Sequence, residues 1–304
     1  MFLRTLACTS VLSCAALCVP LQAQQTSAAI TNDPAADKAN PASMEAVQVP
    51  SHGVLLNGLV YVAAGAGPHP VVVLLHGFPG NEKNLDLAQT IRRAGWDVLY
   101  FDYRGSWGTP GAFSFAHAME DTQAAVAYLR DPVVAKKLRA EPKQIVLVGH
   151  SMGGLLAAWE GAQDSQIEAV GLISAADMSG NAGAILKKSG SEAGAEKTLA
   201  ADLAAEGLAP LAGCTPESLA KELLEHAQVW SLPGFAAKLA SRPVLIVTSD
   251  DGLAASNDAL AEGLDKAGDV EVREVHLATD HAYSDKRIEL QETVLEGLRH
   301  LREE

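Results

Sequence analysis

Cysteine is scarce in this chain of 304 residues, and its distribution excludes an internal disulfide from most of the sequence. Three of the four cysteines, Cys8, Cys14 and Cys18, lie near the N-terminus, and Cys214 stands alone after them. A domain with one cysteine must depend on the size of its hydrophobic core for stability. No pattern places Cys214 beside a histidine and an acid, so we expect it to be inert.

Positive charge and aromatic side chains are also in short supply. The 23 Lys and Arg residues are outnumbered by 37 Asp and Glu, the formal net charge is -14, and aromatic residues make up 5% of the chain. Excess negative charge repels phosphate backbones, and few aromatic rings are present to stack on bases. We therefore expect no nucleic-acid partner. The sequence has no His and Cys cluster with metal-site spacing, so we also expect no metal or other cofactor.

The first 23 residues have the composition of a signal peptide. MFLRTLACTSVLSCAALCVPLQA carries one positive charge at Arg4, continues with an apolar stretch and ends in small residues at Ala23. The stretch is too short and too rich in Ser, Thr and Cys to predict a membrane span. We expect cleavage after Ala23 and export to the periplasm or the medium. The alternative is a lipoprotein anchored through Cys14, which the bulky Leu12 disfavours.

Residues 24–45 are rich in Ala, Asn, Asp and Pro and lack apolar periodicity, so they predict a flexible leader before a domain over 46–304. The domain begins with a predicted hairpin that turns at Ser51-His52-Gly53. After the hairpin, short apolar runs alternate with amphipathic segments: VVVLLHG, NLDLAQTIRRAG, DVLYFDYRG, HAMEDTQAAVAYLRD, QIVLVGH, SMGGLLAAWEGA, AVGLIS, RPVLIVTSD, SNDALAEGLDKAG, VEVREVHLA and DKRIELQETVLEGLRHL.

This alternation predicts an α/β fold with a mostly parallel sheet of about eight strands and helices on both faces. It stops over residues 177–240, which are rich in Ala and Leu with Gly and Pro breaks. We expect several short helices there, inserted between two strands as a cap. Ligands of such sheets bind at the carboxyl ends of the strands, which the cap would cover.

The segment Gly149-His150-Ser151-Met152-Gly153 joins a predicted strand to a predicted helix. The two glycines suit a sharp reversal in which side chains would clash, and the turn would expose the serine hydroxyl. A serine that merely caps the helix is the simpler interpretation. The strand, the helix and the partners available downstream favour Ser151 as a nucleophile. The Met152 N–H at the start of the helix could then stabilise an oxyanion.

From about Glu45 to the C-terminus the chain resembles the α/β-hydrolase superfamily, and secreted esterases and peptidases related to dienelactone hydrolases and prolyl oligopeptidases in particular. The motifs that carry the resemblance are LLHGFPGNEKN, FDYRGSWGTPG, VGHSMGG, VLIVTSDDG and TDHAYSD. The resemblance implies a Ser, acid and His triad in that chain order. It also implies that the Phe78 N–H is the second oxyanion donor and that His76 braces the Phe78 loop.

The base implied by this order is His281, which lies in a loop directly after the last predicted strand. His276 falls within that strand, and His300 falls in the last helix between arginines. For the acid, relatives draw mostly on the loop after the strand VLIVTS, and counting from that strand end places it at Asp251. Asp250 is the adjacent alternative, and Asp177, after the preceding strand, is a third.

These residues predict an exported serine hydrolase that cleaves carboxylic esters with a small or medium apolar acyl group. Two alternatives stay open. The same triad would hydrolyse short peptides or acylated amino acids, and a hydrolase-like binding protein would share the fold without catalysis. The expected partner is a small-molecule ester or acyl substrate. Neither the natural substrate nor the oligomeric state can be derived from the sequence.

Overall fold

A computed structural model describes residues 27–268 and 271–303, so the predicted signal peptide and Cys14 lie outside the described residues. Eight strands form one sheet in the order β1-β2-β4-β3-β5-β6-β7-β8. The strands are β1 Ser43–Ser51, β2 Val54–Val62, β3 His69–Leu75, β4 Asp97–Phe101, β5 Ala140–His150, β6 Ala169–Ile173, β7 Val244–Ser249 and β8 Val272–Leu277.

The first two strands pair antiparallel and the other six run parallel. The β1–β2 hairpin turns at His52 and Gly53, whose φ angles of 44° and 84° lie in the left-handed region that a tight turn requires. Strand β2 pairs antiparallel with β4, and all later pairs are parallel. The predicted fold, a mostly parallel eight-stranded sheet, is confirmed.

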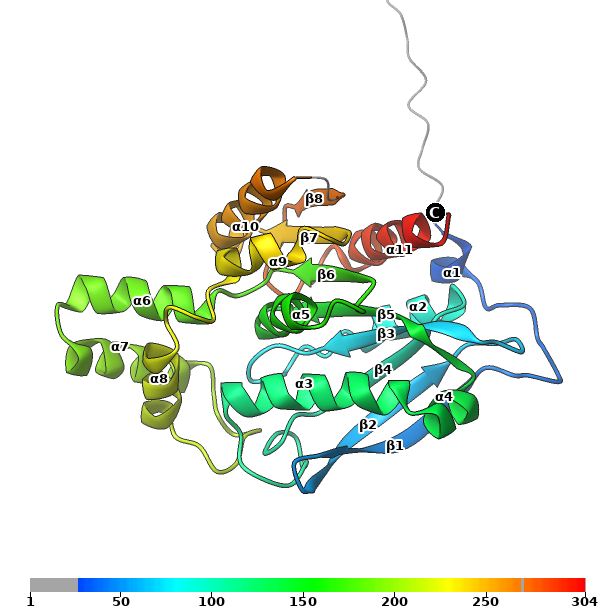
Figure 1. Cartoon of the computed structure of the whole chain (residues 1–304), viewed down its shortest axis with the longest axis horizontal. Coiled ribbons are helices and arrows are strands. Elements are labelled where there is room, and N and C mark those ends of the chain that lie inside the picture. Colours follow the sequence, from blue (N-terminus) through cyan, green and yellow to red (C-terminus); the bar gives the residue numbers. More distant parts are fainter. Residues whose placement is uncertain (1–26, 269–270, 304) are drawn as a thin grey trace, which may run out of the picture.

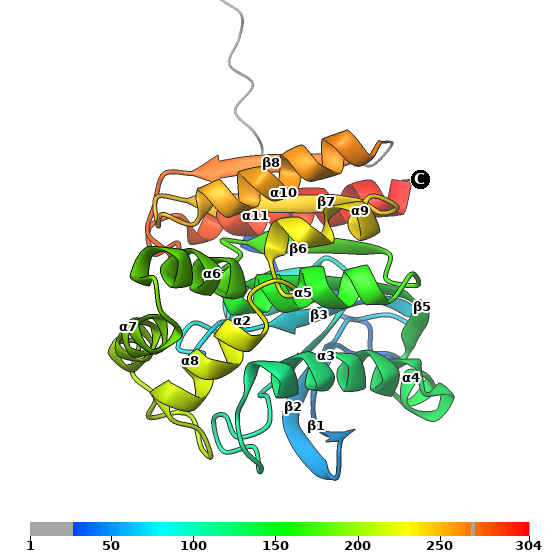
Figure 2. The same cartoon turned by 60° about the vertical axis from the view of Figure 1, so that its left-hand side comes forward.

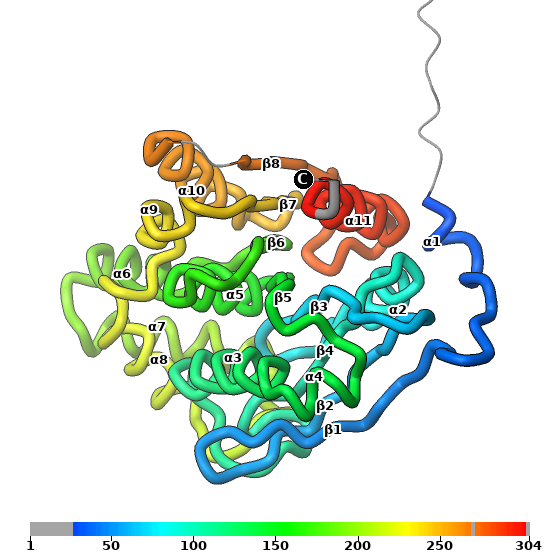
Figure 3. Tube along the Cα trace, turned by 45° about the vertical axis from the view of Figure 1, so that its right-hand side comes forward, coloured from blue at the N-terminus to red at the C-terminus, as the bar shows by residue number. Residues whose placement is uncertain are grey.

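Helices cover both faces of the sheet (Figure 3). On one face lie α3 (Phe115–Arg130), α5 (Met152–Gln163), α9 (Ala236–Leu239) and α10 (Ala254–Ala267), and on the other lie α2 (Leu85–Arg93) and α11 (Arg287–Glu303). A further helix, α4 (Pro132–Leu138), follows α3.

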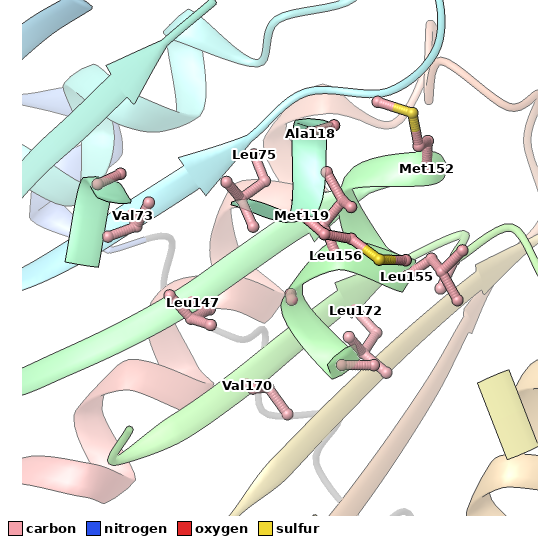
Figure 4. Close-up of a cluster of buried hydrophobic side chains, with 14 of the residues drawn as sticks. Val73, Leu75, Ala118, Met119, Leu147, Met152, Leu155, Leu156, Val170 and Leu172 are labelled. Carbon is pink, nitrogen blue, oxygen red and sulfur yellow. The ribbon is translucent and has the colours of Figure 1, made fainter. Parts of the chain in front are cut away.

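The buried strands supply both faces because alternate side chains point in opposite directions. In β3, Val71, Val73 and Leu75 belong to the apolar cluster under α3 and α5, whereas Val72 and Leu74 belong to the cluster under α2 and α11. Figure 4 shows the first cluster, in which Leu155 and Leu156 of α5 lie over side chains of β3, β5 and β6. Continuous apolar runs such as VVVLL therefore mark strands buried on both faces.

The segment between β6 and β7 consists mostly of helices: α6 (Met178–Ser189), α7 (Glu192–Ala205), α8 (Pro216–Glu225), a 3₁₀ turn (η1, Leu232–Phe235) and α9. We call residues 177–240 the cap. Figures 1 and 2 show α6, α7 and α8 beyond the ends of the strands, on the side to which the parallel strands point. Gly190 ends α6 and Gly207 follows the end of α7, both with φ in the left-handed region that favours glycine at such positions.

Part of the expected leader contacts the domain. Residues Ala28–Thr31 form a one-turn helix, α1, whose Ala29 carbonyl accepts a hydrogen bond from the Arg93 guanidinium of α2. The Asn40 carbonyl accepts a bond of 2.9 Å from the Gly65 N–H, and β1 begins at Ser43. Within the described residues, no helix is both long and apolar enough to span a membrane.

Candidate active site

Ser151 occupies the sharp reversal between β5 and α5. Its φ of 58° and ψ of -122° are strained for a non-glycine residue. A Cβ on Gly149 would lie 1.9 Å from the Gly153 carbonyl oxygen, and one on Gly153 would lie 2.1 Å from the Leu75 carbonyl oxygen. Only glycine fits at either position. The Ser151 N–H donates to the Ile173 carbonyl at 2.9 Å, which holds the turn against the end of β6.

The loop after β3 runs directly beside this serine. A Cβ on Gly77 would lie 2.9 Å from the Ser151 Cβ and 3.4 Å from its Oγ, so the backbone before Phe78 adjoins the hydroxyl. Met152 is the first residue of α5, where backbone N–H groups have no intrahelical acceptor and the helix dipole is positive. The two predicted oxyanion donors therefore belong to backbone segments that adjoin Ser151.

Residues that the sequence analysis did not single out brace the Phe78 loop. The Trp107 indole N–H donates to the Pro79 carbonyl at 2.9 Å, and the Lys83 ammonium lies 4.3 Å from the Trp107 ring centroid. Lys83 also pairs with Asp102 at 3.0 Å. These contacts join the loop after β3 to the loop after β4.

His76 lies at the beginning of the same loop and forms a hydrogen bond within it. Its Nδ1–H donates to the Gly77 carbonyl at 2.8 Å. Burial lowers the pKa of His76 to about 4, so the ring is neutral around pH 7. The hydrogen bond from this neutral imidazole fixes the Gly77 carbonyl in the loop that leads to Phe78.

His281 and Asp251 are in contact. The His281 Nδ1 lies 2.7 Å from the Asp251 Oδ2, and the side chains are 41% and 5% exposed. Burial opposes ionisation of Asp251, but hydrogen bonds from His281, the Leu253 N–H, Ser174 and Ser249 outweigh it and lower the pKa. A carboxylate at Nδ1 keeps the proton there and leaves Nε2 as an acceptor.

The alternative acids have other partners. Asp250 is 64% exposed and lies 3.1 Å from the Nε2 of His276. Asp177 caps α6 by accepting from the Gly180 N–H at 3.1 Å, and it accepts from the Leu232 N–H at 2.9 Å. Asp177 therefore joins the beginning of the cap to its end. Among the predicted acids, the carboxylate hydrogen bonded to His281 is that of Asp251.

Ser151, Asp251, His281 and Phe78 line one cavity of about 700 Å³. The side chains from the cap that line it are mostly apolar, with three polar residues among them: Met178, Asn181, Ala184, Ile185, Leu199, Asp202, Leu203, Glu206 and Leu223. The exposed His300 lines a different cavity, of about 40 Å³, between β6, β7 and α11.

Backbone and side-chain bonds fasten the cap to the domain. The Glu222 carboxylate of α8 accepts from the Phe115 and Ala116 N–H groups, both at 2.9 Å, at the beginning of α3. The Ala212 N–H donates to the Gly105 carbonyl at 2.7 Å. The cap is thus hydrogen bonded to the beginning of α3 and to the loop after β4, in addition to its covalent connections to β6 and β7.

Other reactive groups in the described part of the chain do not form a site of their own. Within residues 27–268 and 271–303, no group of three or more His, Cys, Asp or Glu side chains could hold a metal ion. Cys214 is half-buried, and burial followed by the charge of Glu222 raises the pKa of its thiol. A thiol with a raised pKa is a poor nucleophile at neutral pH.

Comparison with known proteins identifies the family and agrees with the fold. The sequence profile described as "Alpha/beta hydrolase family" matches residues 72–290. An uncharacterised protein of Mycobacterium tuberculosis is 30% identical over 125 residues, which are 41% of this chain and 43% of that protein. The uncharacterised protein YfhR of Escherichia coli is 30% identical over 122 residues, 38% and 40% of the two chains. The matched region is thus less than half the length of these relatives.

Solved structures share the fold at low sequence identity. Est1E from Butyrivibrio proteoclasticus, solved with ferulic acid bound, aligns with a TM-score of 0.63 and 19% identity over 85% of this chain and 100% of that one. An esterase from the archaeon Pyrobaculum calidifontis aligns with a TM-score of 0.61 and 22% identity, over 87% of this chain and 86% of that one. The acylaminoacyl peptidase of Pyrococcus horikoshii aligns with a TM-score of 0.60 and 17% identity, over 84% of this chain and 41% of that one.

Proposed function

The chain belongs to the α/β-hydrolase family, and we propose that it is a serine hydrolase that cleaves carboxylic esters through an acyl-Ser151 intermediate. The observation that carries the proposal is the 2.7 Å contact between His281 and Asp251, in the cavity that Ser151 also lines. A base oriented by a buried carboxylate beside a serine on a strained turn is what acyl transfer requires.

In the first half of the proposed reaction, the His281 Nε2 takes the proton from the Ser151 hydroxyl as the Oγ attacks the ester carbonyl carbon. The negative charge on the carbonyl oxygen is stabilised by the Met152 and Phe78 N–H groups. When the tetrahedral intermediate collapses, the bond to the alcohol oxygen breaks and His281 returns the proton to the leaving alcohol. Water then attacks the acyl carbon as His281 takes a proton from it. The bond between the acyl carbon and the Ser151 Oγ breaks, the acid leaves, and His281 gives the proton back to Ser151.

The lining of the cavity supports a small or medium apolar acyl group. Phe78, Met178, Ile185, Leu199 and Leu203 present apolar surface within the same cavity of about 700 Å³. Burial of an acyl chain against such surface contributes about 0.8 kcal/mol for each methylene group. The solved structures of similar fold include esterases and an acylaminoacyl peptidase, so amide substrates belong in the test.

A fluorophosphonate probe and a substrate panel test the proposal. We expect the probe to label wild-type protein at one serine and to leave the Ser151→Ala variant unlabelled. A panel of p-nitrophenyl acetate, butyrate, octanoate and palmitate should show turnover that falls for the longest chain. Aminoacyl anilides should be slower than the esters. Faster cleavage of the anilides would identify a peptidase, and an unlabelled, inactive wild-type protein would identify a binding protein.

We also propose that the enzyme is exported, on the evidence of its N-terminal sequence. One positive charge, an apolar stretch and small residues before Ala23 support cleavage by a signal peptidase. The mass of the protein recovered outside the cytoplasm should correspond to an N-terminus at Gln24. A mass that included lipid on Cys14 would support the lipoprotein alternative, and a full-length cytoplasmic protein would contradict export.

A further inference from the structure

His150 is a buried histidine that the proposed reaction does not use. It is the last residue of β5, next to Ser151, and is 3% exposed. Its Nε2 lies 2.8 Å from the backbone carbonyl oxygen of His281. A carbonyl only accepts hydrogen bonds, so the Nε2 of His150 must carry a proton.

The other ring nitrogen explains why His150 is neutral. Its Nδ1 is buried and has no hydrogen-bond partner among the described residues. A second proton on Nδ1 would leave a buried donor unsatisfied and place a charge in the core. Burial first, and then the neighbouring His281, lower the pKa of His150 to about 4. The ring therefore persists in one tautomer, as a donor to His281.

The bond joins two segments that are 131 residues apart in the chain. The His150 and His281 rings also lie with their centroids 4.6 Å apart and their planes at 37°. Other bonds hold the His281 loop elsewhere: the Tyr283 hydroxyl donates to the Val247 carbonyl at 3.2 Å, and Arg287 donates to the Ala282 carbonyl at 3.0 Å. Those bonds lead to β7 and α11, whereas the His150 bond leads to the strand that carries the nucleophile.

We propose that His150 is a positioning residue, whose hydrogen bond to the His281 carbonyl holds the catalytic imidazole in place relative to the Ser151 hydroxyl. The proposal rests on the proposed function of Ser151 and His281. Proton transfer between them requires hydrogen-bond distance and alignment, and a displacement of about 1 Å can cost about 10²-fold in rate. A contact made next to the nucleophile, and directed at the backbone of the base, controls that spacing.

Three variants separate the hydrogen bond from the packing of the ring. His150→Gln keeps an N–H donor at similar reach, His150→Phe keeps the ring without a donor, and His150→Met keeps the volume without either. We expect Gln to retain kcat within about threefold, and Phe and Met to lower it by about 10- to 100-fold. KM should change less than about threefold, because the cavity walls are intact. The rate of fluorophosphonate labelling should fall in parallel with kcat.

Thermal melting of each variant serves as the control for folding. If the His150→Met variant does not fold, the comparison of His150→Gln with His150→Phe is sufficient. Three results would each overturn the proposal. They are equal kcat in all variants, equal losses in His150→Gln and His150→Phe, and a loss in His150→Gln with full activity in His150→Phe. A wild-type protein that neither labels nor turns over esters would reject the proposed function and the positioning role with it. If the wild-type protein is labelled and all three His150 variants keep its kcat, the positioning role alone would be rejected.

Discussion

Replacement of Asp251 by asparagine tests the tautomer of His281. The Leu253 N–H donates to the Asp251 Oδ1 at 2.9 Å, and the Oδ2 faces the His281 Nδ1 at 2.7 Å. Asparagine has one oxygen and one NH₂ for these two positions. If its oxygen stays with the Leu253 N–H, the NH₂ faces His281 and needs an acceptor there. His281 must then carry its proton on Nε2, where it cannot accept the serine proton.

The size of the effect follows from this change. The wrong tautomer in a serine, histidine and acid triad lowers kcat by about 10⁴-fold. At 1.36 kcal/mol for each factor of ten, that loss corresponds to about 5.4 kcal/mol of transition-state stabilisation. The opposite amide orientation would restore the tautomer but place the NH₂ against the Leu253 N–H donor. We therefore expect Asp251→Asn to fold normally and to lose about three to four orders of magnitude in kcat.

The assay is p-nitrophenyl ester hydrolysis, with Asp250→Asn as the matched control. Asp250 is its immediate neighbour, but it is 64% exposed and pairs with the surface residue His276. Exposed pairs of this kind contribute about 0 to 1 kcal/mol to stability. Because the carboxylate hydrogen bonded to His281 is that of Asp251, Asp250→Asn should change kcat by less than about threefold. Comparable activity in both variants, or a larger loss in Asp250→Asn, would refute the assignment of Asp251 as the acid.

Three further predictions concern the turn, the cavity and the core. Gly153→Ala should abolish most activity, because its Cβ would lie 2.1 Å from the Leu75 carbonyl oxygen; wild-type turnover would contradict this. Asp202→Asn combined with Glu206→Gln removes two carboxylates that line the cavity and should raise kcat/KM several-fold for an anionic succinyl ester relative to a neutral one. The gain should shrink in high salt, and an equal gain for both esters would exclude charge as the cause. Burial raises the pKa of Asp97 from 3.8 to about 7, so its contribution to stability is complete below pH 3.8 and is lost as the pH rises through 7. Asp97→Asn should therefore gain stability relative to wild type from pH 5 to pH 8.5, by roughly 3 kcal/mol for the two pH units between 5 and the folded pKa of about 7. An equal difference in stability between the two proteins at both pH values would contradict that sign.

Several elements could be predicted because their signals are local. The run VVVLL marks a strand buried on both faces, since alternate residues belong to different apolar clusters. The glycines at 149 and 153 mark the reversal at Ser151, since no side chain fits there. The motifs VLIVTSDDG and TDHAYSD place Asp251 and His281 in the loops that follow β7 and β8. Parallel strands bring such loops to one edge of the sheet.

The choice among Asp250, Asp251 and Asp177 needed the tertiary structure. Adjacent residues point in different directions, and the Asp250 N–H is bonded to the Thr279 carbonyl at 3.0 Å, which leaves its side chain exposed. Asp177 follows a neighbouring parallel strand, as a triad acid could, yet it joins the two ends of the cap. Counting from the strand end favoured Asp251, but the environments of the three carboxylates follow from contacts that only the folded chain makes.

By itself, the sequence determined the succession of strands and helices, the strained turn at Ser151 and the place of His281 after the last strand. Only the tertiary structure decided which carboxylate contacts His281, where the cap is attached and which residue His150 contacts. The physical reason is the range of the interactions. Periodicity and glycine sterics act over a few residues, whereas the bond from His150 to His281 joins positions 131 residues apart and exists only once the sheet has formed.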